Sequence, residues 1–295
     1  MMISLRNLFL NNKMKFTDID RLFIHENPSV VIKHPISNYI WIVGTYFGSI
    51  IFLDARTGEY NPLLVTTDRD IAVSGLAILS SQSVLFVQYR DSFIQSYKII
   101  GSNIDSSLIP LDDGQSYDSS TFASILSIND SIILPFEDRL VSFGRPIDFI
   151  HYEGIPIQFS RDSNGEYLLL SEKHLVCNIT SFSDFNNADP TCFVKLGDYI
   201  LIGTSDGIIL LDNQLIYVDK IELISPFIVN MIQIENQVFI LTKDRILVTL
   251  KLTDDNFSVE AEERLSDSIE AITSVDSTLL LLDECYIEFR PVQSL

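Results

Sequence analysis

Side chains that could carry out catalysis are few in this sequence, and their spacing favours no particular chemistry. A metal site on a helix needs paired ligands such as His-x-x-x-His, and glycoside hydrolysis needs two carboxylates in an enclosed pocket, one of them with a raised pKa. The candidates for such chemistry are His25, His34, His151, His174, Asp112-Asp113 and Asp254-Asp255. No two histidines have a metal-binding spacing, and we interpret both acid pairs as solvated loop residues. The sequence also lacks a nucleophile elbow, a phosphate-binding loop and a dinucleotide-binding glycine motif. It therefore predicts no metal, no cofactor and no catalytic residue.

The cysteines and the N-terminus bear on the compartment. The three cysteines, Cys177, Cys192 and Cys285, lie in apolar runs typical of strands and at no metal-binding spacing. We expect buried free thiols, which are typical of a reducing compartment. The first ten residues lack the apolar stretch of a secretory leader, and no uncharged apolar run approaches the ~18 residues of a membrane helix. We therefore expect an intracellular protein, cytoplasmic or nuclear, without membrane insertion.

The charge balance narrows the class of partner. The 295 residues include 40 Asp and Glu against 20 Lys and Arg, which gives a formal net charge of −20. Binding of nucleic acid needs clustered Lys and Arg, so we expect no direct nucleic-acid partner. Acids gather in two segments, 101–121 and 253–263, which we interpret as insertions. They are either solvating loops or recognition sites for other protein subunits with basic surfaces or tails.

An internal repeat reveals the elements that must position any functional residue. A short, almost wholly apolar strand recurs seven times, each time between two further apolar strands separated by polar turns. From Ile40 in the first of these strands to Leu279 in the last, the mean spacing is about 40 residues. Strands this apolar are packed on both faces, because a strand with one wet face would alternate. The seven central strands begin at or near Ile40, Val84, Ile132, Tyr167, Ile200, Val238 and Leu279.

Seven units at this spacing predict an all-β fold, a seven-bladed β-propeller that forms a single domain over residues 1–295. Each blade would be a small antiparallel sheet whose faces pack against its neighbours. The alternative is a non-repetitive pair of β-sandwiches. Outer fourth strands are expected at Tyr60–Thr66, Ile147–Tyr152, Leu215–Leu223 and Phe257–Leu265. The expected blades span residues 27–67, 68–111, 121–153, 154–188, 189–224, 225–265 and 266–295.

The last blade ends soon after its third strand, so it lacks an outer strand of its own. Residues 1–26 precede the first blade and contain two spare apolar segments, Leu5–Leu10 and Phe16–Ile24. We expect one of these segments to pair with the last blade. This pairing would close the ring and remove an exposed sheet edge.

Two blades carry residues that resemble a known repeat. Residues 44–58 read GTYFGSIIFLDARTG, and residues 203–212 read GTSDGIILLD. Both resemble the end of a WD repeat, in which a Gly-Ser/Thr-x-Asp-Gly turn leads to a Trp-Asp pair. Asp54 and Asp212 stand at the Asp of that pair with Leu in place of Trp, and no Gly-His pair precedes a blade. The chain thus resembles the divergent WD-repeat-like propellers, which implies a protein-interaction scaffold. We interpret the acids at the equivalent turns as structural: Asp91, Asp138, Glu172, Asp206, Asp244 and Glu284. The alternative is that several of them line one face and bind a cation or a basic peptide.

The same hairpin turns hold the candidate binding residues. Aromatic and arginine side chains dominate interface energetics. The candidates for partner binding are exposed aromatic or basic residues of the turns, namely Tyr46, Phe47, Tyr89, Arg90, Phe136, Lys173 and Lys243. We interpret the protein as a non-enzymatic scaffold, a subunit of a larger intracellular complex. Two alternatives stay open: a reader of basic, Lys/Arg-rich tails with an aromatic cage, and a hydrolase-type enzyme with its site at the central channel.

Overall fold

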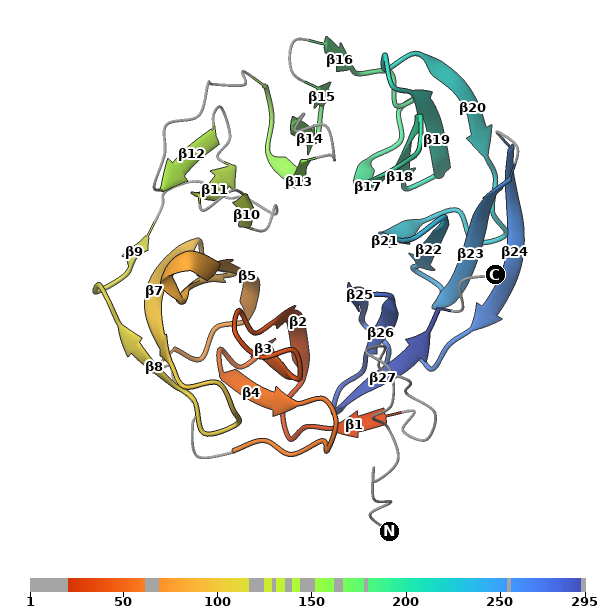
Figure 1. Cartoon of the computed structure of the whole chain (residues 1–295). Coiled ribbons are helices and arrows are strands. Elements are labelled where there is room, and N and C mark those ends of the chain that lie inside the picture. Colours follow the sequence, from red (N-terminus) through yellow and green to blue (C-terminus); the bar gives the residue numbers. More distant parts are fainter. Residues whose placement is uncertain are drawn as a thin grey trace. The chain divides into compact units, whose positions relative to one another are not determined.

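Antiparallel β-sheets make up the fold (Figure 1). The computed structural model describes residues 21–61, 69–116, 125–128, 131–135, 140–143, 152–161, 167–177, 180–253 and 256–292. The chain divides into two compact units. The first unit comprises Met1–Tyr117 and Ser268–Leu295, and the second comprises Asp118–Asp267. That residues 1–295 form one domain stays a prediction.

The first unit holds three sheets. Their strand orders are β2-β3-β4, then β5-β6-β7-β8 with β9 also paired to β7, and β1-β27-β26-β25. A single 3₁₀ turn, Ser80–Gln82, connects β5 to β6. The strands are β1 (Arg21–Phe23), β2 (Pro28–Lys33), β3 (Ile40–Thr45), β4 (Ile50–Asp54), β5 (Val73–Leu79), β6 (Val84–Tyr89), β7 (Phe93–Ile100), β8 (Ser107–Pro110), β9 (Gln115–Ser116), β25 (Ala271–Val275), β26 (Thr278–Leu282) and β27 (Tyr286–Pro291).

The second unit holds four sheets, with the orders β10-β11-β12, β13-β14-β15-β16, β17-β18-β19-β20 and β21-β22-β23-β24. The strands are β10 (Leu126–Ile128), β11 (Ser131–Pro135), β12 (Leu140–Phe143), β13 (Pro156–Arg161), β14 (Tyr167–Ser171), β15 (Leu175–Cys177), β16 (Thr180–Phe182), β17 (Pro190–Leu196), β18 (Tyr199–Thr204), β19 (Gly207–Asp212), β20 (Tyr217–Ile221), β21 (Ile228–Ile234), β22 (Gln237–Thr242), β23 (Ile246–Thr253) and β24 (Asn256–Arg264).

The seven predicted central strands are confirmed as β3, β6, β11, β14, β18, β22 and β26, each of which pairs on both edges. Two predicted outer strands are confirmed as β20 and β24. Tyr60 forms one bridge with Leu53. The other two predicted outer strands, Tyr60–Thr66 and Ile147–Tyr152, lie mostly outside the described residues. Of the first, Tyr60 and Asn61 are described, and of the second, Tyr152.

The interpretation of both acidic segments as insertions was wrong for the residues that the structure describes. Segment 101–121 contributes β8 and β9, which pair with β7, and segment 253–263 lies largely in β24, which pairs with β23. Asp112 is not a free loop acid, because its carboxylate accepts hydrogen bonds from Ser96 Oγ at 2.5 Å and from the Gly114 amide at 3.0 Å. Acidic side chains mark these segments as solvent-facing, but the backbone still completes the ladder of the adjacent sheet.

The apolar cores lie between neighbouring sheets within each unit. In the first unit, one core packs β3 and β4 against β5 and β6, and a second packs the opposite face of β3 and β4 against β26 and β27. The Trp41 and Phe289 rings lie 5.3 Å apart in the second of these cores. The second unit repeats the arrangement between successive sheets. This two-sided packing explains why the central strands are apolar throughout.

A glycine near the end of the second strand allows two sheets to approach closely in each unit. A Cβ at Gly44 would lie 2.6 Å from Val73 Cγ1, and a Cβ at Gly203 would lie 2.7 Å from Ile228 Cγ2. Val73 and Ile228 are both the first residue of the next sheet's first strand. The Gly-Thr dipeptide of the two WD-like segments therefore has a packing role.

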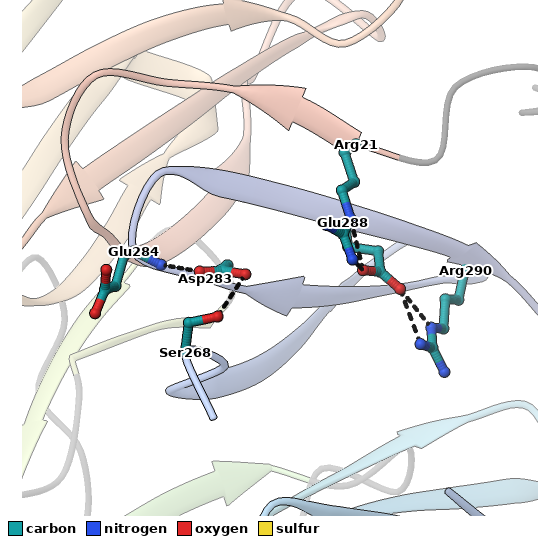
Figure 2. Close-up of polar contacts among 6 residues, drawn as sticks. All are labelled: Arg21, Ser268, Asp283, Glu284, Glu288 and Arg290. Carbon is teal, nitrogen blue, oxygen red and sulfur yellow. Dashed lines mark hydrogen bonds and ion pairs between the residues drawn. The ribbon is translucent and has the colours of Figure 1, made fainter. Parts of the chain in front are cut away.

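The N-terminal strand β1 completes the last sheet. It pairs antiparallel with β27, and Leu22 lies opposite Ile287. Leu22 and Ile24 are buried in the core shared by the first and last sheets. This confirms that a segment within Phe16–Ile24 pairs with the last blade, whereas Leu5–Leu10 lies outside the described residues. Figure 2 shows Glu288 of β27 between Arg21 of β1 and Arg290, which it meets through ion pairs of 2.8 Å each.

Candidate functional site

The hairpin turn after each second strand lies beside the segment that enters the same sheet. In five sheets, the amide of the first turn residue donates a hydrogen bond to the carbonyl of the residue just before the first strand. These bonds are Tyr46 N to Asn27 O, Arg90 N to Ala72 O, Glu172 N to Ile155 O, Ser205 N to Asp189 O and Lys243 N to Phe227 O, at 2.8–3.1 Å. The two segments therefore form one continuous surface at this end of each sheet, which we call the turn face of that sheet.

Buried hydroxyl groups fix the backbone of four of these turns. Thr45, Ser171, Thr204 and Thr242 each end a second strand and are almost fully buried. Thr204 Oγ1 donates to the carbonyl of Gly207 at 2.9 Å and accepts from the amide of Asp206 at 3.1 Å. Since a buried hydrogen bond of this kind contributes about 1 kcal/mol, the turns are held rigidly and present their exposed side chains in fixed positions.

Acids of the turns tie them to the entering segments. Asp91 forms an ion pair with Arg69, and Asp244 Oδ2 accepts a hydrogen bond from Ser225 Oγ at 2.8 Å. In the last sheet, Asp283 Oδ2 accepts from Ser268 Oγ at 2.9 Å (Figure 2). Asp206 pairs instead with Lys220 Nζ of the outer strand at 2.7 Å, and this hydrogen bond raises the pKa of Lys220. These contacts support the structural interpretation of Asp91, Asp206 and Asp244, while Asp138 lies outside the described residues.

The acids at the WD-like positions act at the other end of their sheets. Asp54 Oδ1 accepts from the amide of Arg56 at 2.8 Å, and its carboxylate also pairs with the Arg56 guanidinium. Asp212 Oδ1 accepts from the amides of Gln214 and Ile216 at 2.8 and 2.9 Å. Both acids therefore hold the turn that follows the third strand, which is the role of a short capping side chain.

In the first unit, aromatic and basic side chains are exposed together on the turn face. The Phe47 side chain is 56% exposed at the tip of the turn between β3 and β4. The adjacent Tyr46 is half-buried, and the guanidinium of Arg90, from the next sheet's turn, lies 6.0 Å from its ring. Gly48 brings the turn close to the segment that enters the next sheet, since a Cβ there would lie 2.0 Å from the Arg69 carbonyl oxygen.

In the second unit, the turn face exposes an apolar pair that sequence reasoning missed. Ile224 is 81% exposed and Phe227 is also exposed, both in the segment that enters the sheet of β21–β24. Lys243 Nζ lies 4.8 Å from the Phe227 ring, within the range of a cation–π contact. The buried Ser225 between them anchors this segment through Asp244. The Ser-Pro-Phe sequence signals a turn, but nothing local indicates which of its side chains face solvent.

The predicted binding residues differ in their placement. Phe47, Arg90, Lys173 and Lys243 are exposed in their turns, and Tyr46 is half-buried. Tyr89 is 1% exposed, so its prediction as an exposed binding residue was wrong. It ends β6 and packs in the core between the first two sheets, with its ring 5.9 Å from Phe93. Phe136 lies outside the described residues. The structure brings Tyr46 and Arg90 together.

The cysteines and histidines are placed in structural surroundings. All three cysteines are free, with Cys177 and Cys192 buried and Cys285 half-buried, so the prediction of full burial was wrong for Cys285. Burial raises the pKa of the Cys192 thiol to about 12, which leaves it unreactive at neutral pH. Burial lowers the pKa of His34, whose Nδ1 accepts from the amides of Ile36 and Ser37 at 3.2 Å.

Two further observations apply to the described part of the chain. Within it, no three His, Cys, Asp or Glu side chains gather as a bound metal ion would require. No helix among the described residues has the length and the apolar character needed to cross a bilayer.

Comparisons with known proteins give the fold. No family model and no curated protein matches the sequence. Many solved structures match, and three that cover almost the whole chain serve as examples. The YCF48 protein bound to a D1 peptide is 10% identical, covering 93% of this chain and 96% of that one, with a TM-score of 0.65. The WD40 β-propeller domain of Doa1 is 13% identical, covering 93% and 97%, with a TM-score of 0.65. A chain of the mitotic checkpoint complex is 10% identical, covering 100% and 99%, with a TM-score of 0.70.

These similarities agree with the seven antiparallel sheets, the two-sided cores and the completion of the last sheet by β1. The identities are low, so the likeness concerns fold and carries no function with it. The chain has the fold of a divergent WD-repeat-like β-propeller, in which the seven sheets are the blades.

Proposed function

We propose that this chain is a non-enzymatic protein-interaction module that serves as a subunit of a larger intracellular assembly. The observation that carries the proposal is the presence of large apolar side chains exposed on the turn faces, one in a hairpin turn and one in an entering segment. Phe47 in the first unit and Ile224 in the second are 56% and 81% exposed. Rigid aromatic and aliphatic anchors supply much of the binding energy at protein interfaces, because ordering them on binding costs little entropy.

The residues beside these anchors indicate the character of the partner. Arg90 lies near the Tyr46 ring, and Lys243 lies near the Phe227 ring, so each of these two turn faces combines an aromatic side chain with a basic neighbour. The remainder of the chain is strongly acidic, with a net charge of −20. The proposed partners are therefore protein subunits that cover the apolar anchors and place basic groups against the acidic surroundings.

Two of the similar structures support this class of function by analogy. One is a protein bound to a peptide, and the other is a chain of the mitotic checkpoint complex. An intracellular setting, cytoplasmic or nuclear, is part of the proposal and is supported by the three free cysteines.

No observation favours an aromatic cage for a modified lysine or a hydrolase site at the channel. An aromatic cage for a modified lysine would have used Tyr46, Phe47 and Tyr89, but Tyr89 is buried in the core. A hydrolase would need histidine and acid side chains together. Instead, His34 is hydrogen-bonded to backbone amides, and His25 lies against Phe23, with 4.8 Å between the rings.

Affinity capture with matched variants tests the proposal. Tagged wild-type chain, Phe47→Ser, Ile224→Ser and the control Ile109→Ser would be purified from cells of the source organism, and co-purifying proteins would be quantified by mass spectrometry. Ile109 lies on the outer strand β8 and is 53% exposed, so the control removes a comparable apolar surface away from the turn face.

We expect stoichiometric partners with the wild type and the control. A partner that contacts either anchor should be depleted about tenfold by that substitution, since burying half of a large apolar side chain contributes roughly 1–2 kcal/mol. Recovery of the wild-type chain alone, or equal recovery of every partner with all variants, would refute the proposal.

A further inference from the structure

The outer strand β24 differs from the other outer strands in length and exposure. It has nine residues, whereas β1, β8, β16 and β20 have three, four, three and five. Natural sheets often keep exposed edges short, because a long free edge is a template for pairing with another chain. The nine-residue β24 departs from this rule in its length, and its edge carries instead a β-bulge at Glu260 and exposed charges.

Only one edge of β24 is paired among the described residues. The strand ends the order β21-β22-β23-β24, and its eight register partners all belong to β23. In an antiparallel ladder, alternate residues direct their N–H and C=O groups to opposite edges, so about four residues of β24 present hydrogen-bonding groups outward. These groups are oriented to receive another strand.

Both faces of the strand are open as well. Every residue from Ser258 to Arg264 is exposed, so side chains of both alternating sets meet solvent. At the start of the strand, the Phe257 ring packs edge-on against Tyr199, 5.6 Å away, which anchors this end to the preceding sheet. Among the described residues of this unit, no further strand pairs with this exposed part.

The side chains of β24 select the kind of strand that can be added. Glu260, Glu262 and Glu263 are exposed on the strand, and Arg264 is its single base. Glu260 is already engaged by Gln237 and Lys251, and Glu262 is exposed farther along the strand. Like charges disfavour pairing of this edge with a second copy of a chain that carries a net charge of −20.

We propose that β24 is a docking strand, to which a partner adds an extended segment of about nine residues rich in Lys and Arg. Backbone hydrogen bonds would supply the pairing, and alternate basic side chains would meet the carboxylates on the two faces. This inference deepens the proposed scaffold function, because it assigns a second surface and a partner chemistry. It is independent of the turn face.

A peptide of defined chemistry tests the proposal on the full chain. The probe is a labelled, end-capped nine-residue peptide in which lysine alternates with threonine. Its control is the same peptide with every backbone nitrogen methylated, which keeps all the lysine charges and removes every backbone N–H donor. Binding would be measured by fluorescence anisotropy at low and high salt, and hydrogen exchange of residues 256–264 would be followed by mass spectrometry.

We expect binding that weakens at high salt and slows exchange within residues 256–264. The methylated peptide should bind at least about tenfold more weakly, because it cannot join the ladder. Glu262→Gln combined with Glu263→Gln should weaken binding about three- to tenfold. The charge-matched control, Glu172→Gln with Glu222→Gln, removes two exposed acids of the same unit that are not part of β24 and should change binding less than about twofold.

Three results would overturn the proposal. The first is equal binding of the methylated peptide, which would indicate charge attraction alone. The second is protection located outside residues 256–264 or no binding at all. The third is a dimer of the unliganded chain that already protects β24, which would make a second copy the occupant. The Phe47→Ser and Ile224→Ser variants should bind the peptide as the wild type does, so loss of the turn-face function and loss of strand docking are distinguishable.

Discussion

Substitution of Leu22 tests how much β1 contributes to stability. Leu22 is 3% exposed in the core that the first and last sheets share, and a Cβ at Gly58 would lie 2.8 Å from its Cδ2 atom. Leu-to-Ala changes at buried sites cost about 2–5 kcal/mol, and the cost is lower where the surroundings can collapse into the gap. Since β1 has three residues and pairs only with β27 among the described strands, we expect a loss of about 2–3 kcal/mol from Leu22→Ala.

The neighbouring residues of β1 provide matched controls. Phe23 is 45% exposed, and Arg21 forms an exposed ion pair with Glu288. Phe23→Ala and Arg21→Ala should each cost about 1 kcal/mol or less, because a half-exposed ring loses little burial and an exposed ion pair contributes little. Comparing the three variants separates the contribution of side-chain burial from that of strand pairing, because the three residues lie on the same strand.

Urea unfolding followed by tryptophan fluorescence measures these differences directly. The chain has one tryptophan, Trp41, and it lies in the same core cluster as Leu22. A loss below about 0.5 kcal/mol for Leu22→Ala, or equal losses for all three variants, would show that β1 does not complete the core of the last sheet. The reasoning about closure by the N-terminal strand would then fail.

Four further substitutions test packing and titration. Gly203→Ala should lower the free energy of unfolding in urea by about 1–3 kcal/mol, because the added Cβ would lie 2.7 Å from Ile228 Cγ2. In a double-mutant cycle, Ile228→Ala should relieve part of that loss. Simple additivity of the two losses would contradict the packing argument. Burial lowers the pKa of His34, so its contribution to the free energy of unfolding is present above about pH 6.5 and is lost as the pH falls through the folded-state pKa. His34→Asn should therefore reduce the dependence of the unfolding free energy on pH between pH 7 and pH 4. An unchanged pH dependence would count against a buried, neutral His34. Burial raises the pKa of Cys192 to about 12, so its contribution is full below about pH 9 and is lost as the pH rises toward 12. Unfolding curves of Cys192→Ala should lack that part of the alkaline slope, and rapid alkylation of native Cys192 at pH 8 would contradict the assignment.

Much of the candidate site could be anticipated from the turns, because their polar residues stand at the same place in each repeat. Phe47, Arg90, Lys173 and Lys243 are exposed in turns as expected. Tyr89 was misplaced, since its exposure depends on the neighbouring sheet that covers it and not on its position at the end of a strand. Ile224 was missed for the converse reason, because an isoleucine in a short connecting segment carries no local mark of exposure.

The amino-acid sequence by itself determined the number, order and approximate limits of the central strands. Their apolar runs follow from a local requirement, because a strand packed on both faces needs an apolar residue at every position. Only the tertiary structure decided which N-terminal segment completes the last sheet, which acids hold the turns, and how far β24 stands exposed. These properties depend on contacts between residues distant in the chain, so no short stretch of the sequence contains all the residues that determine them.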